Sequence, residues 1–258
     1  MLSLFLLILG FSLLYFGGEF LVKGSVGFSE KFSISKLVAG ITIVSFATSS
    51  PELFVSLEAI INESSDIVFG NIIGSNIANI ALVLGCTALF FNISISEKTL
   101  KVDYPFLFFA TISVGYILYF LGAITFFTGL ILLIILSAYL FYIITSSRKE
   151  IKEEISVANS EENNSYTRCF VYLILGIILL KYGADFLVSS AIEIASLLNI
   201  EERVIAVTVI AIGTSVPELA TSIVAALKKE VDLAVGNIVG SNIFNLLAVL
   251  GVTAIYKD

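Results

Sequence analysis

Eight stretches of the chain are apolar over about 20 residues, the length that a helix needs to cross a lipid bilayer. They cover residues 2–22, 37–61, 67–92, 104–121, 124–146, 168–190, 204–227 and 232–256. Hydrophobic residues make up 58% of the 258 residues and charged residues only 14%, whereas charged residues make up about 25% of an ordinary soluble domain. A soluble core of this size cannot cover so much apolar surface. The sequence therefore predicts an all-α polytopic membrane protein with about 8 transmembrane helices.

Side-chain types that are missing or scarce exclude several classes of function. The chain has no histidine, so a histidine base, histidine metal ligation and a histidine proton relay are excluded. Cys86 and Cys169 both lie in apolar stretches and predict neither a disulfide framework nor a metal cluster. A basic surface that could bind nucleic acid is also missing, since the net charge is −7. The expected partner is the lipid bilayer, with no nucleic acid and no organic cofactor.

Lysine and arginine fall almost entirely on one side of the predicted membrane. Eleven lie in loops that alternate helices bring to the same side: Lys23, Lys31, Lys36, Lys98, Lys101, Arg148, Lys149, Lys152, Arg168, Lys228 and Lys229. Only Arg203 and Lys257 lie on the other side, and Lys181 lies inside a span. Because cytoplasmic loops carry the excess of basic residues, the bias predicts a multi-pass protein of the cytoplasmic membrane. Its N-terminus is expected outside and its polar segment 147–167 in the cytoplasm.

Three pairs of segments recur at a constant spacing of 166 residues. The matching pairs are LLYFGGEFLV at 13–22 with LLKYGADFLV at 179–188, ATSSPEL at 47–53 with GTSVPEL at 213–219, and GNIIGSNIAN at 70–79 with GNIVGSNIFN at 236–245. Chance similarity between apolar helices would not keep one spacing without a gap, so we identify an internal duplication with a first and a second copy. This recurrence, together with the lack of a basic N-terminal region, argues against a cleaved signal peptide.

The duplication predicts three parts: repeat 1 at 1–146 with five helices, a cytoplasmic linker at 147–167, and repeat 2 at 168–258 with three helices. Five is an odd number, so the second copy enters the membrane from the opposite side. Inverted repeats of this kind are typical of secondary transporters, with the binding site at mid-depth between the halves. Repeat 2 lacks two helices that repeat 1 has. We therefore expect a shortened chain, or one that a partner chain or a homo-oligomer completes.

Two glutamates lie in the middle of predicted spans, Glu52 in the second and Glu218 in the seventh. A carboxylate at the bilayer centre costs at least about 2.5–3.5 kcal/mol, so intramembrane acids face inward and are functional by default. The alternative is a purely structural ion pair, for which Lys181 is the only candidate cation. Glu19 and Asp185, which are equivalent in the two copies, are expected near an interface as snorkelling or capping charges.

Each glutamate follows a proline in a Thr-Ser-x-Pro-Glu segment, with Pro51 and Pro217 at equivalent positions. Proline has no N–H and disrupts the preceding helical turn, so each segment predicts a broken helix at mid-membrane. Neighbouring hydroxyls add further oxygens: Thr48, Ser49, Thr214 and Ser215. Without the glutamate, a simple proline kink would explain each segment. With it, cation binding is the better interpretation.

A second motif provides the facing wall of the predicted site. Polar residues recur every four positions along one helix face: Asn71, Ser75 and Asn79, then Asn237, Ser241 and Asn245. Gly70 with Gly74 and Gly236 with Gly240 form GxxxG pairs that let backbones approach closely. Asn76 and Asn242 point to a different face and are expected to form hydrogen bonds between helices. Two carboxylates with many neutral oxygens form a ligand set for hard cations such as Ca²⁺.

With its duplicated TSxPE and GNxxGSN motifs, the chain resembles the cation/Ca²⁺ exchanger superfamily, specifically the prokaryotic sodium/calcium exchanger type. The resemblance covers nearly the whole chain and implies ten helices in two inverted repeats, with Ca²⁺ efflux driven by Na⁺ entry through alternating access. The proton-driven branch has a Glu after its Gly-Asn pair, whereas Ile72 and Ile73 follow Asn71 here. This difference favours Na⁺ as the coupling ion.

The resemblance also implies a set of ion ligands. Ca²⁺ would bind Glu52, Glu218 and the carbonyls of Thr48 and Thr214. Flanking Na⁺ sites would use Ser45, Thr48, Ser49 and Ser75 from the first copy, and Ala211, Thr214, Ser215 and Ser241 from the second. Asn79 and Asn245 would complete the centre, and Asn245 stands where some members have an acid, which makes K⁺ dependence less expected.

The leading hypothesis is thus a secondary active antiporter, not an enzyme, that exports Ca²⁺ in exchange for Na⁺, with both ions as transported substrates. Exchange of another cation pair, such as H⁺ for Ca²⁺, remains open. So does a non-transporting membrane fragment that binds ions and needs a partner.

Overall fold

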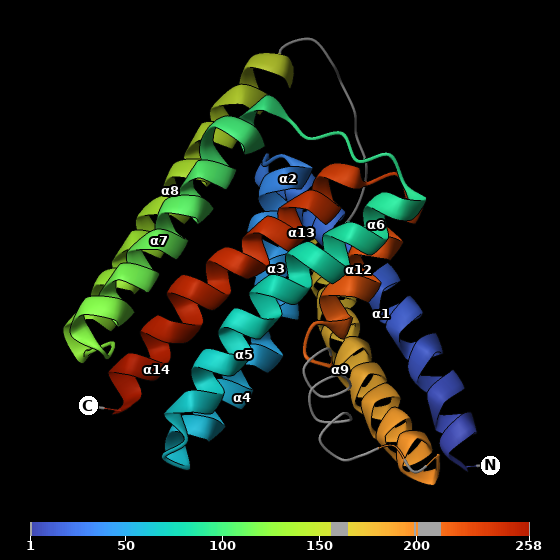
Figure 1. Cartoon of the computed structure of the whole chain (residues 1–258). Helices are drawn as coiled ribbons and strands as arrows, with labels where there is room; N and C mark the ends of the chain where they lie inside the picture. The colour runs from blue at the N-terminus through green and yellow to red at the C-terminus, as the bar shows by residue number, and fades with distance from the viewer. Residues whose placement is uncertain (1, 156–164, 199, 201–212, 258) are drawn as a thin grey trace.

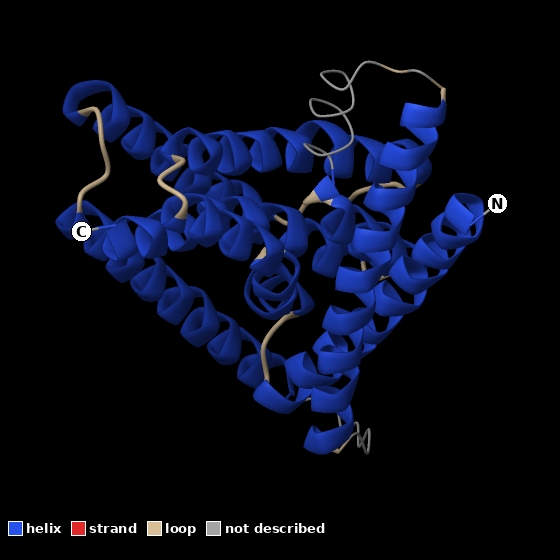
Figure 2. Ribbon diagram, turned by 90° about the horizontal axis from the view of Figure 1, so that it is seen from below, coloured by secondary structure: helices blue, strands red, loops and turns tan. Residues whose placement is uncertain are grey.

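The computed structural model describes residues 2–155, 165–198, 200 and 213–257. Figure 2 shows only helices and their connecting segments across these ranges. Among the described residues, six helices are long and apolar enough to cross a membrane, and a seventh span exists if the bent pair Lys36–Thr48 and Ser50–Ile61 counts as one. The predicted all-α polytopic fold is therefore confirmed. Residues 204–212, the first part of the predicted seventh span, lie outside the described ranges.

Within the described ranges, the elements include four π-helical turns. The helices are α1 (Leu2–Phe32), α2 (Lys36–Ala39), α3 (Ser45–Thr48), α4 (Ser50–Ile61), α5 (Ser65–Ala78), α6 (Gly85–Phe90), α7 (Tyr104–Leu121), α8 (Phe126–Ile155), α9 (Tyr166–Leu197), α12 (Val216–Leu227), α13 (Val231–Phe244) and α14 (Leu250–Lys257). The π-helical turns are η1 (Gly40–Val44), η2 (Asn79–Leu84), η3 (Thr99–Asp103) and η5 (Asn245–Val249). Such turns join α5 to α6 and α13 to α14 at equivalent places in the two copies.

Two helices extend well beyond the apolar stretches that predict them. α1 continues from the predicted end at residue 22 to Phe32, and α8 continues from 146 to Ile155. Hydropathy marks where the membrane ends, not where a helix ends. In α1 the extension buries Ser25 and Ser29 against its neighbours, so tertiary packing prolongs the helix. The predicted linker thus begins as the last turns of α8, while residues 156–164 lie outside the described ranges.

α1 and α9 pack tightly along most of their length (Figure 1). A Cβ atom at Gly17 would lie 2.8 Å from the Leu180 nitrogen, and one at the equivalent Gly183 would lie 2.9 Å from the Leu14 nitrogen. Such distances are possible only because glycine lacks a side chain. The two contacts exchange when each residue is replaced by its counterpart 166 positions away. This reciprocal packing agrees with an inverted repeat, although the domain boundaries at 146 and 168 stay a prediction.

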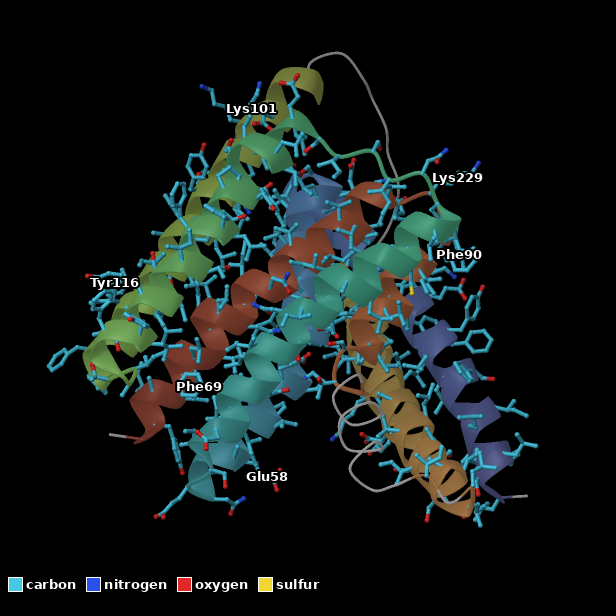
Figure 3. The ribbon with its side chains drawn as sticks, in the orientation of Figure 1. Glu58, Phe69, Phe90, Lys101, Tyr116 and Lys229 are labelled. Atoms are coloured by element: carbon cyan, nitrogen blue, oxygen red, sulfur yellow. The ribbon has the colours of Figure 1, made fainter. Side chains whose placement is uncertain are left out.

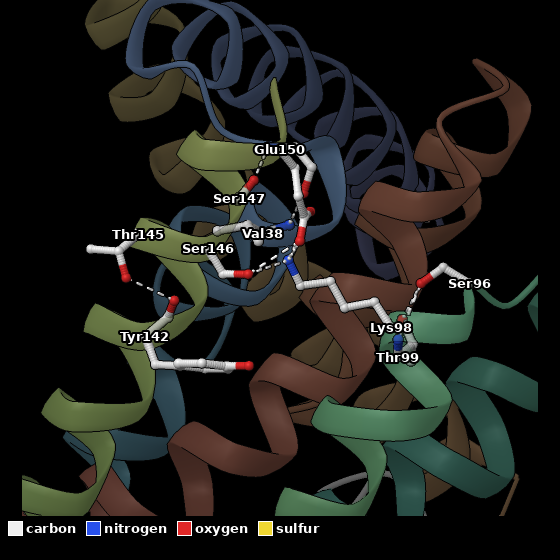
Figure 4. A network of polar contacts seen from close by, with 10 residues as sticks. Val38, Ser96, Lys98, Thr99, Tyr142, Thr145, Ser146, Ser147 and Glu150 are labelled. Atoms are coloured by element: carbon white, nitrogen blue, oxygen red, sulfur yellow. Dashed lines mark hydrogen bonds and ion pairs between the residues drawn. The ribbon is translucent and has the colours of Figure 1, made fainter. Parts of the chain in front are cut away.

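The α7–α8 pair packs against α13 and α14 on the other side of the molecule (Figure 1). At the end where α8 stops and α9 starts, which we call the linker end, polar contacts join these elements. Lys98 donates to Glu150 at 2.9 Å and to Ser146 at 3.2 Å (Figure 4). The backbone N–H of Ser35 donates to the Ser147 hydroxyl at 2.7 Å. The Lys98 bonds hold α8 to the segment that leads through η3 into α7, and the Ser35 bond holds α8 against the turn that leads from α1 into α2.

The structure agrees with the predicted uneven distribution of lysine and arginine between the two sides. Lys101 and Lys229, both assigned to the cytoplasmic side, lie toward the linker end, whereas Glu58 lies toward the opposite end (Figure 3). Large apolar side chains such as Tyr116 and Phe90 project from the outer surface with 62% and 75% of their area exposed. An apolar outer surface with charges at its ends is what a lipid environment requires.

Candidate ion-binding site

Both Thr-Ser-x-Pro-Glu segments adopt the same backbone geometry at the point where a helix starts anew. Ser49 has φ −85° and ψ 3° before α4, and Ser215 has φ −89° and ψ 2° before α12. In the first copy the helix axis bends by 43° at this break. Pro51 stands in the first turn after it, where a missing N–H costs no hydrogen bond. The predicted break is therefore present in the second span.

Glu52 and Glu218 stand in the first turns of α4 and α12, and both side chains are 0% exposed. Within the described part of the chain, neither carboxylate oxygen of Glu52 has a hydrogen-bond partner, and neither does Oε2 of Glu218. Oε1 of Glu218 accepts a 3.3 Å hydrogen bond from the Ser49 hydroxyl. Burying a carboxylate without partners is very costly, so such oxygens are expected to bind a ligand.

The structural alternative, a buried ion pair, finds no support among the described residues. No ion pair there includes Glu52 or Glu218. Lys181 is exposed instead, and its ammonium lies 5.9 Å from the centre of the Tyr182 ring. No group of three acidic, histidine or cysteine side chains converges in these ranges either. The candidate site thus combines two carboxylates with neutral oxygens, as the sequence predicts.

Hydroxyl groups from the two copies meet at the site in equivalent pairs. The Thr48 and Ser241 hydroxyls lie 3.3 Å apart, and the Ser75 and Thr214 hydroxyls lie 3.2 Å apart. Thr214 is 166 residues after Thr48, and Ser241 is 166 residues after Ser75. Thr48 also donates to the side-chain oxygen of Asn237 at 3.1 Å. Four predicted site residues from distant parts of the chain therefore come together.

The remaining predicted ligands are buried as well, except one that lies outside the described residues. Ser215, Asn79 and Asn245 are each 0% exposed, and their side-chain oxygens have no hydrogen-bond partner in the described part of the chain. The buried Ser45 hydroxyl donates back to the carbonyl of Ile41. Ala211 lies outside the described residues. The unpartnered oxygens of the described chain thus concentrate on residues that the sequence selected.

Two asparagines of the polar stripes have a supporting role that sequence reasoning missed. Asn71 donates to the backbone carbonyl of Glu52 at 3.1 Å and to the Ser56 hydroxyl at 3.0 Å. The equivalent Asn237 donates to the Glu218 carbonyl at 3.4 Å and to the Ser222 hydroxyl at 3.1 Å. Each asparagine therefore holds the helix that carries the glutamate, α4 or α12, against its own helix, α5 or α13. The serine one turn beyond each glutamate was the available signal, since a buried serine in an apolar span needs a partner.

The two GxxxG pairs differ in what they contact. A Cβ atom at Gly240 would lie 2.6 Å from the Ile41 Cα, so the close backbone approach predicted for the second copy is confirmed. Gly70 and Gly74 have no such neighbour within 4 Å in the described part of the chain. Residues of the segment 37–45 contact the glycines of the second copy, and the equivalent segment for the first copy, 203–211, lies outside the described residues. The predicted approach in the first copy therefore stays a prediction.

The site is enclosed differently on its two sides. Between α4 and α9 lies a cavity of about 470 Å³, whose lining includes Pro51, Thr214 and Asp185. At the equivalent place in the other half, α1 packs directly on α12, and a Cβ atom at Gly18 would lie 3.2 Å from Val224. Thr214 thus faces a cavity, whereas its counterpart Thr48 is 1% exposed.

Glu19 and Asp185 also differ, although they occupy equivalent positions. Glu19 forms ion pairs with Lys23 at 3.0 Å and with Lys228 at 2.8 Å, which joins α1 to the turn between α12 and α13. The expected place of Glu19 near the membrane interface, as a snorkelling or capping charge, stays a prediction. Asp185 is exposed on α9 and lines the cavity.

Comparison with known proteins finds a family model and relatives that match nearly all of the chain. A family model described as "Sodium/calcium exchanger protein" matches residues 2–145 and 169–258. The putative antiporter CaxA of Alkalimonas amylolytica is 37% identical over 262 residues, which cover 98% of this chain and 80% of the relative. The inner membrane protein YrbG of Escherichia coli K12 is 34% identical over 256 residues, covering 97% and 78% of the two chains.

A solved structure shares the fold. The sodium-calcium exchanger NCX_Mj, in crystals soaked without Na⁺ and Ca²⁺, matches with a TM-score of 0.84 and 32% sequence identity. The match covers 99% of this chain and 82% of the solved one. At this identity and coverage the likeness extends to the whole arrangement of helices described above.

Proposed function

Because this chain belongs to the sodium/calcium exchanger family, we propose that it exports Ca²⁺ in exchange for Na⁺. A membrane antiporter for cations follows from the family, and the direction and the ion pair are the proposal. Transport would proceed by alternating access to one central site that contains Glu52 and Glu218.

The observation that supports this proposal most directly is the pair of buried carboxylates. Three of their four oxygens have no partner within the described residues, and both side chains are fully buried. Two negative charges can neutralise one divalent cation or be shared by monovalent cations that compete for the same oxygens. Competition of this kind at one site is the physical basis of exchange.

The proposed ligands follow the pattern expected from the sequence. Ca²⁺ would bind the two glutamates with the carbonyls of Thr48 and Thr214. Flanking Na⁺ ions would use the surrounding small residues: Ser45, Thr48, Ser49, Ser75, Ala211, Thr214, Ser215 and Ser241. Asn79 and Asn245 would complete the centre between the two glutamates. The hydroxyl pairs at 3.2–3.3 Å between the copies support this assignment, because they bring oxygens of both halves within reach of one ion.

The unequal packing of α1 and α9 supports alternating access. α9 leaves a cavity against α4, while α1 is closed against α12. In an inverted repeat the two halves exchange conformations, so the opposite access state would open α1 and close α9. With the N-terminus outside and the linker in the cytoplasm, as the lysine and arginine distribution favours, the cavity would belong to an outward-facing state of a protein in the cell membrane.

Transport by the purified protein in liposomes tests this proposal. We expect ⁴⁵Ca²⁺ uptake into vesicles loaded with Na⁺ and diluted into Na⁺-free buffer. Vesicles loaded with K⁺, and vesicles given a pH jump instead of a Na⁺ gradient, are the controls. Uptake driven equally by the pH jump would show H⁺/Ca²⁺ exchange instead, and Ca²⁺ binding without any uptake would show a non-transporting ion-binding protein.

A further inference from the structure

Four asparagine side chains cross between α5–η2 and α13–η5, where the two copies meet. Nδ2 of Asn79 donates to Oδ1 of Asn242 at 3.1 Å, and Nδ2 of Asn245 donates to Oδ1 of Asn76 at 3.2 Å. Each bond joins one copy to the other, and the two bonds are equivalent under the spacing of 166 residues. The expectation that Asn76 and Asn242 form hydrogen bonds between helices is therefore confirmed.

These bonds determine whether the oxygen or the nitrogen of the Asn79 and Asn245 amides faces the ions. An asparagine amide has a donor end and an acceptor end, and only the oxygen can bind a cation. The nitrogens of Asn79 and Asn245 are engaged by the opposite copy, while both side-chain oxygens are buried and without a partner in the described part of the chain. A rotated amide would turn its N–H groups toward the cation and would repel it.

We propose that Asn76 and Asn242 are positioning residues that hold the Asn79 and Asn245 amides with their oxygens toward the transported cation. This inference rests on the proposed function, because it requires a cation at the site. Neither positioning residue needs to touch the ion. Each acts through the amide of the other copy, which also makes the geometry of one half-site depend on the other half.

A purely structural role is the alternative, because Asn76 also donates to the backbone carbonyl of Asn242 at 3.3 Å. That bond holds α5 against α13 whether or not an ion is present. The two roles differ in one consequence. A positioning residue loses its effect on ion binding when the amide that it positions is removed, whereas a structural contact does not.

Equilibrium ⁴⁵Ca²⁺ binding to the purified chain separates these roles in a double-mutant cycle of Asn79→Ala and Asn242→Ala. We expect each single variant to weaken Ca²⁺ binding about 10-fold or more, as supporting residues of metal sites do. The double variant should bind no more weakly than Asn79→Ala alone. Asn62→Ala, which changes an exposed asparagine at the end of α4, is the matched control and should bind like the wild type.

Losses that multiply in the double variant would overturn the proposal, and so would wild-type binding by Asn242→Ala. If Asn242→Ala does not fold, as judged by circular dichroism, the equivalent cycle of Asn76→Ala and Asn245→Ala gives the same test. A wild-type chain that binds no Ca²⁺ contradicts the proposed function itself. A wild type that binds Ca²⁺ while Asn242→Ala binds equally well contradicts only the positioning role.

Discussion

The Ser49 hydroxyl donates a 3.3 Å hydrogen bond to Oε1 of Glu218, so residues 169 positions apart in the chain meet inside the membrane. The equivalent hydroxyl of Ser215 has no partner in the described part of the chain, and neither carboxylate oxygen of Glu52 has one. The two glutamates are therefore unequal in this conformation, although their sequence surroundings are nearly the same. In alternating access, one side of the binding site is open while the other is closed. The two halves of the molecule must therefore differ in conformation, because identical halves would close both sides at once.

Replacing either glutamate by glutamine should abolish transport. Glu52→Gln and Glu218→Gln keep the size of the side chain but remove one negative charge from a fully buried site. We expect Na⁺-driven ⁴⁵Ca²⁺ uptake to fall by on the order of 100-fold, at the upper end of what is seen for weakened metal sites. Circular dichroism should show an unchanged helix content. Uptake at the wild-type rate in either variant would refute the assignment of that glutamate.

The inequality of Ser49 and Ser215 predicts different effects of the same substitution. Ser49→Ala leaves Glu218 without its hydroxyl donor, whereas Ser215→Ala removes a hydroxyl that has no partner in the described residues. In ion-free buffer we expect Ser49→Ala to cost about 1–3 kcal/mol of stability, and Ser215→Ala to cost less. Thermal unfolding followed by circular dichroism measures the difference. Equal shifts in melting temperature would contradict the assigned hydrogen bond.

The site was the most predictable part of the molecule, because lipid makes polar side chains conspicuous. Glu52, Thr48 and Ser75 stand out within apolar spans, and the duplication identifies their partners in the second copy. The burial of Glu52 and Glu218 follows from the same cause, since an exposed carboxylate at this depth would be unstable. Their roles as ion ligands stay a prediction that the experiments above address.

Other features depend on tertiary contacts that the sequence does not encode locally. Asn71, Asn76 and Asn79 lie on one helix, and only the position of α4 and α13 decides that Asn71 supports Glu52 while Asn76 holds Asn245. Hydropathy likewise could not predict the true ends of α1 and α8, because their last turns are polar. A duplicated sequence also describes two equivalent packings, so it could not indicate which half is closed.

The packing of α1 on α9 should tolerate no side chain at its glycines. A Cβ atom at Gly176 would lie 2.7 Å from the Leu21 nitrogen, which belongs to backbone and cannot move aside. We expect Gly176→Leu to cost at least about 1–3 kcal/mol, the usual cost of overpacking, and to lower the melting temperature. Gly115→Leu is the matched control, since a Cβ atom at Gly115 meets nothing within 4 Å among the described residues. Equal losses in both variants would contradict this packing.

The ion pair between Glu19 and Lys228 should stabilise the closed arrangement of α1 on α12. It joins the two elements at 2.8 Å, and the equivalent residues Asp185 and Asn62 cannot form an ion pair. Glu19→Gln should therefore favour the state in which α1 separates from α12. Partly exposed ion pairs contribute about 0.2–1 kcal/mol, which corresponds to a shift of up to about fivefold between the two states.

A cysteine at Val224 can report this shift, because the side chain is 3% exposed and faces Gly18 of α1. In a chain with Cys86 and Cys169 replaced by alanine, we expect Glu19→Gln to raise the rate at which a maleimide modifies Val224→Cys by up to about fivefold. Lys23→Gln is the matched control, since it removes the partner of Glu19 on the same helix and leaves the bond to α12–α13 intact. A rate that Glu19→Gln does not change, or that Lys23→Gln raises equally, would show that the pair does not hold α1 closed.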